Sequence, residues 1–231
     1  MSAGLLATVL AVNFFLCSGY GPIGNITCFN TINCDKSSMY SDLFARIVLS
    51  SPIGRDVLCD TKTDGGGWIM IVRRSIGDVV FSRGWAEYKY GFGTYYGDYW
   101  MGLEQVHQLT MVGRWELRVD IKFKGKDYYA KYDLFEVENE AQFYKLHVGD
   151  FSGNVSDGLS YHDGMRFYTS DKPTSNDCSR KYSGGWWFQE CHRAYLTGVW
   201  GSRVLYSGIH WYPLSPTENL DSVEMKMRKL C

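Results

Sequence analysis

The sequence has no excess of charge of either sign. Its 24 Lys and Arg residues are matched by 25 Asp and Glu, which gives a formal net charge of −1 at pH 7, and no long run of like charge occurs. Proteins that bind nucleic acid or anionic membranes electrostatically carry a basic excess or a basic patch. The composition therefore indicates neither nucleic acid nor a charged membrane surface as a partner.

Repeated sequence is also missing. The 231 residues contain no internal repeat, no collagen-like Gly-X-Y tract and no heptad run. A collagen stalk or a coiled coil is therefore not visible as a means of assembly. A chain of this length fits one large domain. We expect that domain over residues 34–231, preceded by a short segment at 20–33.

Long hydrophobic runs are limited to one, over residues 5–16, which Thr8 and Asn13 interrupt. The run is too short to span a bilayer comfortably, and small residues follow it at 17–19. This pattern is typical of a secretory signal peptide, which we place at residues 1–19. An uncleaved anchor is the alternative, because no basic residue stands near Met1. A signal peptide predicts a secreted, extracellular protein without membrane insertion.

The cysteines are few and their number is informative. Seven are present, and removal of the signal peptide with Cys17 leaves six. An even number in an exported chain favours disulfides over free thiols or zinc. The six are Cys28, Cys34, Cys59, Cys178, Cys191 and Cys231.

Two N-glycosylation sequons begin at Asn25 and Asn154. The acceptor sequence places such residues on the surface of a protein that passes through a eukaryotic secretory route. We therefore expect surface glycans at these two positions.

Strand patterns dominate the secondary structure. Apolar and charged residues alternate over 115–123 and again over 223–228, as in half-buried antiparallel strands. Residues 128–137 follow a turn at Gly125-Lys126-Asp127 and should pair with 115–123 as a hairpin. The continuous apolar run at 68–72 predicts a central strand buried on both faces. Helical signal is thin and is clearest as a short helix over 102–110.

The region from about residue 150 to 220 shows little periodicity and is rich in Gly, Ser, Asp and aromatic residues. A long irregular stretch inside a compact domain is uncommon and usually functional. We expect the functional site there.

Catalytic constellations are missing from this region and from the rest of the chain. Cys191 and His192 are neighbours, so in extended chain their side chains point to opposite sides, whereas a nucleophilic pair needs hydrogen-bond reach. A zinc site from Cys178, Cys191 and His192 would lack the close cysteine spacing and a fourth ligand. The glycines of 91–97 miss the phosphate-loop spacing. The chain is not expected to be an enzyme.

A stapled loop explains the stretch DCSRKYSGGWWFQECH at 177–192 better. A Cys178–Cys191 disulfide would close a loop and stabilise the folded state by about 3 kcal/mol, because it lowers the entropy of the unfolded chain. It would hold Tyr182, Trp186, Trp187 and His192 in fixed positions without a regular element beneath them. The alternative is that both tryptophans belong to the core and that His192 is an ordinary hydrogen-bonded histidine.

Seven motifs occur in order along the chain and together resemble one family. They are CDTKTDGGGWIMIVRR (59–74), FSRGWAEYKYGFG (81–93), YWMGLEQVHQLT (99–110), ELRVDI (116–121), LSYHDGMRFYT (159–169), GGWWFQECH (184–192) and VEMKMR (223–228). The chain resembles a fibrinogen-related domain, the C-terminal globe of fibrinogen chains, ficolins, tachylectins, tenascins and angiopoietins.

The resemblance implies an α+β fold: a globe with a central, mostly antiparallel sheet, short helices and a long irregular ligand-binding subdomain. It also implies the disulfides Cys34–Cys59 and Cys178–Cys191. Cys28 and Cys231 remain, and would bond to each other or to another chain. A homo-oligomer, disulfide-linked or non-covalent, is therefore expected as an option.

In lectin-like members of this family the stapled loop forms a pocket for acetyl groups. Aromatic walls take the methyl group, while a histidine and backbone N–H groups bind the carbonyl. Matched by position, the resemblance assigns this role to Tyr182 and His192, and gives Tyr206 as a second pocket tyrosine. It further implies a cis peptide bond between Glu190 and Cys191, which would turn backbone groups towards the pocket.

Lectin members also hold calcium in an acidic loop before the first cysteine of the staple. Here the loop keeps Asp171 but has Pro173 where the second aspartate stands, and it gains Lys172. Calcium requires six to eight oxygen ligands, several of them anionic. The resemblance thus implies a weakened calcium site built from Asp171, Asp177 and loop carbonyls. Residues 195–198 also differ from the sequence that supports the pocket in the lectins.

Two functional hypotheses follow. The first is a secreted, non-enzymatic, lectin-like recognition protein of innate defence that binds acetylated or related glycans on microbial or cell surfaces. The second is a secreted ligand or matrix-type partner that binds a cell-surface receptor, as angiopoietin and tenascin relatives do. The stapled aromatic loop with Tyr182 and His192 makes the first the leading hypothesis, while the altered calcium loop and the altered residues 195–198 favour the second modestly.

Overall fold

A computed structural model describes residues 44–47 and 55–230. The expected signal peptide, the segment 20–33, the sequon at Asn25 and the cysteines Cys28, Cys34 and Cys231 lie outside the described residues. Among the described residues, no helix has the length and apolarity needed to cross a membrane.

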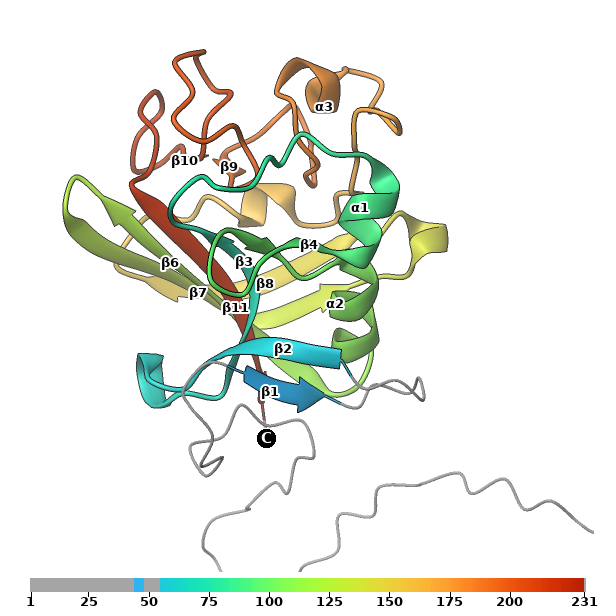
Figure 1. The fold of residues 1–231 in the computed structure, drawn as a ribbon, viewed down its shortest axis with the longest axis vertical. Coiled ribbons are helices and arrows are strands. Elements are labelled where there is room, and N and C mark those ends of the chain that lie inside the picture. Colours follow the sequence, from blue (N-terminus) through green and yellow to red (C-terminus); the bar gives the residue numbers. More distant parts are fainter. Residues whose placement is uncertain (1–43, 48–54, 231) are drawn as a thin grey trace, which may run out of the picture.

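The chain folds as an α+β globe in which antiparallel strands form one large sheet (Figure 1). The strands are β1 (Phe44–Ile47), β2 (Arg55–Asp60), β3 (Trp68–Arg74), β4 (Phe92–Gly93), β5 (Tyr99–Trp100), β6 (Arg114–Phe123), β7 (Lys126–Val137), β8 (Leu146–Gly153), β9 (Ala194–Tyr195), β10 (His210–Trp211) and β11 (Ser222–Leu230). The helices are α1 (Trp85–Tyr90), α2 (Leu103–Thr110) and α3 (Cys178–Lys181), with 3-10 turns η1 (Thr63–Gly65), η2 (Glu140–Gln142) and η3 (Ser160–His162).

The main sheet has the order β1-β2-β3-β11-β6-β7-β8, with the short strands β4 and β5 attached beside β3. The last strand, β11, therefore inserts between β3 and β6 and joins the two halves of the sheet. Its pairing matches the sequence pattern, because Val223 lies opposite Ile121 and Met225 opposite Val119 on the core face. Alternation thus fixes the register, since a one-residue slip would turn these apolar side chains to solvent.

The predicted strands and helix are confirmed, with one correction at the hairpin. Residues 68–72 are fully buried in β3, and α2 buries Leu103, Val106 and Leu109 as expected. The β6–β7 turn consists of Lys124 and Gly125, both with positive φ, and Lys126 already pairs with Phe123. The predicted turn at Gly125-Lys126-Asp127 therefore began one residue too late. The observed two-residue turn is favoured because two positive φ angles suit the twist of paired strands.

The core lies between one face of the sheet and the segments that cover it. Helix α2 packs on β7 and helix α1 packs on α2. Aromatic rings fill the interior: Trp68, Trp100, Trp115, Trp186, Trp187 and Trp211 are all less than 2 % exposed. The irregular segments with α3, β9 and β10 form the end of the globe that stands above the sheet in Figure 1.

Candidate functional site

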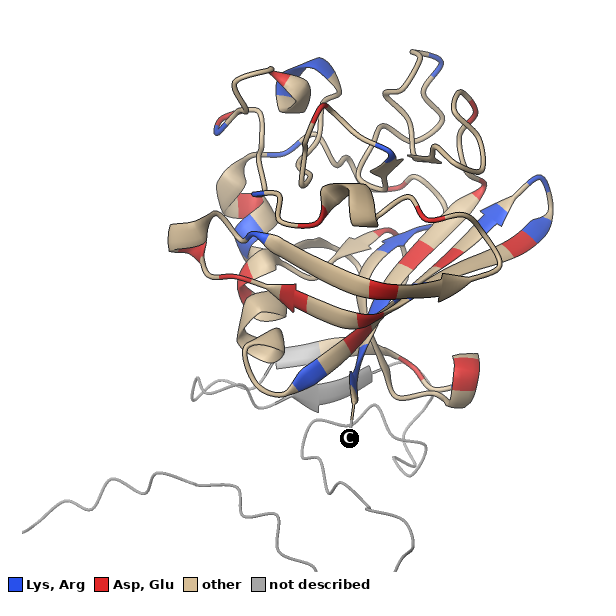
Figure 2. Ribbon diagram, turned by 180° about the vertical axis from the view of Figure 1, so that it is seen from behind, with Lys and Arg blue, Asp and Glu red and all other residues tan. Residues whose placement is uncertain are grey.

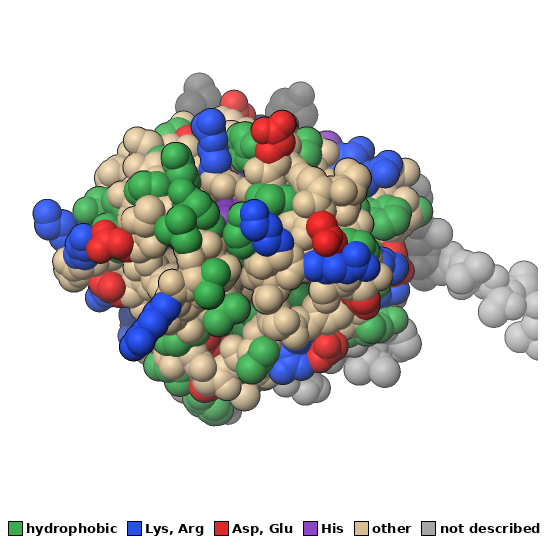
Figure 3. All heavy atoms as spheres, turned by 90° about the horizontal axis from the view of Figure 1, so that it is seen from above, with side chains coloured by type: hydrophobic (Ala, Val, Ile, Leu, Met, Phe, Trp, Pro, Cys, Tyr) green, Lys and Arg blue, Asp and Glu red, His purple; other side chains and the backbone are tan. Residues whose placement is uncertain are grey.

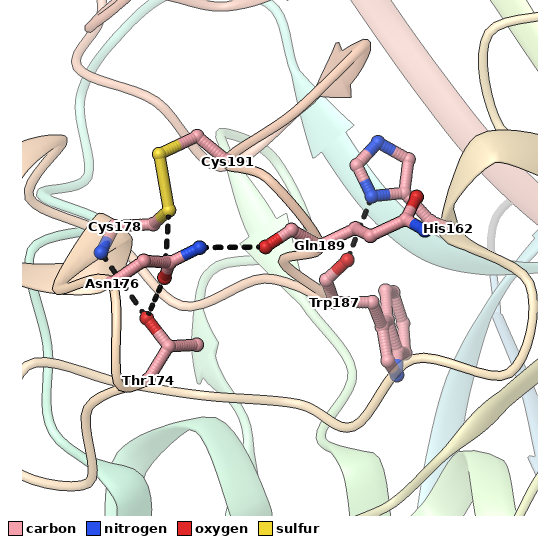
Figure 4. Close-up of a disulfide and its surroundings, with 7 residues drawn as sticks. All are labelled: His162, Thr174, Asn176, Cys178, Trp187, Gln189 and Cys191. Carbon is pink, nitrogen blue, oxygen red and sulfur yellow. Dashed lines mark hydrogen bonds between the residues drawn. A yellow bond between two sulfur atoms is a disulfide. The ribbon is translucent and has the colours of Figure 1, made fainter.

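The stapled loop is present in the structure. A disulfide joins Cys178, at the start of α3, to Cys191, with the two Cα atoms 5.2 Å apart (Figure 4). Asp177 and Ser183, on either side of α3, both have left-handed φ angles near 60°. The cross-link holds this tightly turned segment closed, as the sequence predicted. Cys59 is also disulfide-bonded, but Cys34 lies outside the described residues, so the Cys34–Cys59 pairing stays a prediction.

The expected cis peptide bond is absent. All peptide bonds among the described residues are trans, including the one between Glu190 and Cys191. The chain turns instead through Cys191, whose φ is 63°, and the Gln189 N–H donates to the Cys191 carbonyl at 3.3 Å. A left-handed residue achieves the reversal without a cis bond, which for a non-proline residue is rarely formed. Glu190 itself is exposed.

A side-chain amide braces the loop from outside. The Nδ2 of Asn176 donates to the Gln189 carbonyl at 2.7 Å, and the Cys178 N–H donates to the Thr174 hydroxyl at 3.2 Å (Figure 4). The first bond ties the segment before α3 to the segment that leads into Cys191, and the second holds the start of α3. The brace works with neutral polar groups alone.

His192 lies in a cluster of rings. It stacks on Tyr195 with ring centroids 4.6 Å apart and planes 7° apart, and it contacts Tyr182 at 4.7 Å and His210 at 4.6 Å. Tyr206 reaches the same cluster, 6.2 Å from His210. The structure therefore brings together the three residues that the sequence assigned to a pocket. We refer to Tyr182, His192, Tyr195, Tyr206 and His210 as the ring cluster.

Three imidazole nitrogens of the ring cluster lack hydrogen-bond partners. Both ring nitrogens of His192 and the Nε2 of His210 are buried without a hydrogen bond to any described residue. Burial lowers the pKa of His192 to about 2, and the neighbouring His210 adds to this effect. A neutral imidazole with unpaired nitrogens costs stability, so such groups in a native protein require an explanation. A small polar ligand that reached this cluster would supply the missing partners.

Three histidines meet near the staple, and the sequence identified only one of them. His162 is completely buried, and its Nδ1 lies 2.7 Å from the Trp187 carbonyl (Figure 4). Its Nε2 accepts from the N–H groups of Arg193 and Ala194. Because Nε2 accepts, the proton resides on Nδ1, which donates to Trp187. His162 thus fixes the strand that follows His192. Burial lowers its pKa to about 4.

The two tryptophans of the stapled loop belong to the core. Trp186 and Trp187 are 0 % and 1 % exposed, and the Trp187 Nε1 donates to the Tyr144 carbonyl at 2.7 Å. The alternative that both tryptophans belong to the core is therefore confirmed. They anchor the loop in the core, while Tyr182 and His192 pack against each other in the ring cluster.

The residues of the calcium loop do not fit a calcium site. The Asp171 carboxylate accepts from the Trp85 N–H at 3.0 Å and from the Thr169 hydroxyl at 2.6 Å, so it caps the start of α1. Asp177 instead accepts from Arg180 at 3.2 Å. Within the described part of the chain, no group of three or more His, Cys, Asp or Glu side chains is placed to hold a metal. Hydrogen-bond donors occupy the oxygens that calcium would need.

The most exposed apolar side chains of the irregular end lie on one loop, residues 199–207, which we call the tip loop. The Val199 N–H donates to the Ser207 carbonyl at 2.8 Å and closes this loop. At its tip, Val204 is 68 % and Leu205 53 % exposed. Seen from above, hydrophobic side chains gather on one part of this face, beside a recessed histidine (Figure 3).

A second segment extends this apolar surface. The Trp200 ring of the tip loop lies against Gly77, where even a Cβ atom would come within 2.2 Å of the ring. The neighbouring Ile76 is 62 % exposed. Sequence reasoning missed both segments, because isolated exposed apolar residues are common on protein surfaces and only the fold brings these together.

Comparisons with known proteins agree on one family. The family model "Fibrinogen beta and gamma chains, C-terminal globular domain" matches residues 32–230. Tenascin-R from Homo sapiens is 40 % identical over 201 residues, which cover 85 % of this chain but only 15 % of that protein. This chain thus spans a small part of its tenascin relatives.

Solved structures give the same result. The fibrinogen-like globe domain of human ANGPTL2 superposes with a TM-score of 0.78 at 32 % identity, covering 83 % of this chain and 94 % of that one. Lamprey fibrin D-dimer, complexed with the peptide Gly-His-Arg-Pro-amide, superposes with a TM-score of 0.75 at 25 % identity, covering 83 % and 71 %.

Proposed function

This chain belongs to the family of fibrinogen C-terminal globular domains, and on that premise we propose that it is an exported, non-enzymatic recognition domain that binds a protein partner, such as a receptor or a matrix component. The observation that carries the proposal is the exposed apolar surface of the tip loop beside the ring cluster.

The composition of that surface suits a protein partner. Buried centres of protein interfaces are apolar and depleted in charge, and exposed apolar patches on monomers mark interaction sites. Val204, Leu205 and Ile76 are each more than half exposed. Trp200 and the hydrogen bond between Val199 and Ser207 fix the loop beneath them. A preformed loop loses little conformational entropy on binding.

The relatives favour the same choice. The matching proteins include Tenascin-R and the globe domain of ANGPTL2, and the fibrin relative was solved with a peptide ligand. These neighbours support protein or receptor partners better than they support the binding of acetylated glycans. Export is supported by the signal-peptide pattern and by the disulfide between Cys178 and Cys191.

A second candidate function is recognition of a small acetylated ligand at the ring cluster. The unpaired nitrogens of His192 and the Nε2 of His210 favour it, because a bound carbonyl or hydroxyl group would satisfy them. The surrounding aromatic walls suit a methyl group. The ring cluster and the tip loop are neighbours, because Tyr206 belongs to both, so one partner could engage both.

Binding to cell surfaces tests the proposal. The purified, fluorescently labelled domain, multimerised to raise avidity, is incubated with a panel of cell types and quantified by flow cytometry. The double variant Val204→Ser/Leu205→Ser should lose most of the bound signal. Met111→Ser/Val112→Ser serves as the matched control, because these residues are 60 % and 52 % exposed but follow α2, outside the irregular end.

Equal binding by both double variants would contradict the role of the tip loop. Equal melting temperatures for the two variants and the wild type would establish that a lost signal reflects the surface and not the fold.

A further inference from the structure

The main sheet has a second, polar face. The strand register places Glu224 of β11, Asp120 of β6 and Tyr129 of β7 in one row across it. Asn154, just after β8, continues this row, because its N–H donates to the Tyr129 carbonyl at 3.1 Å. All four residues line a groove of about 390 Å³. Figure 2 shows the charged residues that alternate along the strands on this side.

Asn154 is the first residue of a sequon, and its side chain is held in one orientation. The Tyr129 N–H donates to the Asn154 Oδ1 at 2.6 Å. The Nδ2 of the exposed Asn154 makes no hydrogen bond with any described residue. This nitrogen is the atom that N-glycosylation modifies.

The rest of the sequon is also fixed. Val155 is buried, and the Ser156 carbonyl accepts from the Trp211 Nε1 at 2.8 Å. The Ser156 residue is nevertheless exposed. The sequon backbone is therefore anchored at Asn154 and after it, and Asn154 itself lines the groove, so a group attached to Nδ2 starts beside the groove.

From these observations we propose that Asn154 carries an N-linked glycan whose first sugars lie in the groove of the polar face. The donor is an oligosaccharide on a lipid pyrophosphate. A bond forms between the Asn154 Nδ2 and C1 of the first sugar, while the bond from C1 to the phosphate oxygen breaks. The amide loses a proton and the lipid pyrophosphate departs. This inference goes beyond the proposed function and shares with it only the requirement for export.

The groove offers the contacts that sugars use. Asp120 and Glu224 bring carboxylate oxygens to the groove, and Arg118 and Lys122 bring N–H donors. These groups already form ion pairs, such as Arg118 to Asp120 at 2.8 Å and Lys122 to Asp127 at 3.6 Å, and sugar hydroxyls would add hydrogen bonds to them. The groove volume lies within the range of small-ligand pockets. The Arg118 guanidinium lies 4.3 Å from the centre of the Tyr129 ring, so both side chains are held in place at the floor. A glycan here covers the polar face and leaves the tip loop uncovered.

The test uses the full chain secreted from eukaryotic cells. Peptide mass spectrometry after enzymatic removal of N-glycans, which converts a modified Asn to Asp, should show that Asn154 is occupied. Lys122 lines the groove with a half-exposed side chain, whereas Lys124, two residues along, lies outside it with 63 % of its side chain exposed. Acylation of Lys122 under native conditions should rise several-fold when the glycan is removed, while acylation of Lys124 stays constant.

The variant Ser156→Ala provides the matched control. It removes the acceptor sequence but keeps the hydrogen bonds of Asn154 and the Ser156 carbonyl, so its Lys122 should react as in the deglycosylated protein. An unmodified Asn154 in secreted, folded protein would overturn the proposal. An occupied Asn154 with unchanged Lys122 reactivity would overturn the placement of the sugars. Neither result bears on the tip loop, whose variants keep the sequon.

Discussion

Removal of the disulfide between Cys178 and Cys191 should destabilise the domain by an amount that follows from the loop it closes. The two cysteines are 13 residues apart in the chain. The loop-entropy model then gives a stabilisation of about 3 kcal/mol at 25 °C. For a domain of this size, this loss corresponds to a decrease in Tm of about 6–12 °C.

The double variant Cys178→Ala/Cys191→Ala tests this magnitude. Urea unfolding followed by tryptophan fluorescence is suitable, because six tryptophans are almost fully buried and report on the core. The free energy of unfolding should fall by about 3 kcal/mol, with a similar slope against urea concentration. The released loop should also relax at Ser183 and Cys191, whose left-handed conformations the cross-link holds.

Binding to cells should also decrease. At a temperature where the double variant is still folded, its binding to cells should be reduced, because the cross-linked segment supports the ring cluster beside the tip loop. If the free energy of unfolding decreased by less than about 1 kcal/mol, the loop-entropy argument would be refuted, since this is well below the predicted value. Full binding by the folded double variant would refute the role of the staple in recognition.

Four further predictions concern single groups. His162→Ala leaves one carbonyl and two N–H groups buried without partners, so the free energy of unfolding should fall by about 3 kcal/mol or more in urea titrations. Burial lowers the pKa values of His162 and His210 to about 4, whereas an unfolded imidazole titrates near 6.5. The unfolded state therefore binds more protons as the pH falls. Each histidine should thus lower the free energy of unfolding by roughly 2 kcal/mol between pH 7.5 and pH 5. Asp171→Ala should lower the free energy of unfolding by about 1 kcal/mol, because the Trp85 N–H at the start of α1 loses its acceptor. Calcium or a chelator should leave the wild-type Tm unchanged, as measured by calorimetry. His192→Phe keeps the stacked ring but removes unpaired nitrogens, so stability should hold or rise while binding of acetylated sugars, measured by calorimetric titration, is lost.

Much of the fold could be predicted from sequence because its determinants are local. Alternation at 115–123 and 223–228 follows directly from a sheet with one buried face, and the continuous apolar run at 68–72 follows from burial on both faces. The insertion of β11 between β3 and β6 is not local. It is fixed by matching apolar faces far apart in the chain, which periodicity alone does not reveal.

The site was only partly predictable for the same reason. Cysteine spacing identified the staple, but the burial of Trp186 and Trp187 depends on what packs beneath the loop. His162 and His210 come from distant segments and meet His192 only after folding. The commitment of Asp171 to the start of α1 likewise depends on a residue 86 positions away.

The most direct test of the recognition surface is the binding of multimerised domain to cells treated in three ways. If the tip loop recognises a protein, mild protease treatment of the cells should abolish binding of the wild-type domain. Removal of cell-surface glycans, and competition with N-acetylglucosamine, should leave that binding intact. Binding that survives protease treatment and is competed by the sugar would contradict the account and assign recognition to the ring cluster alone.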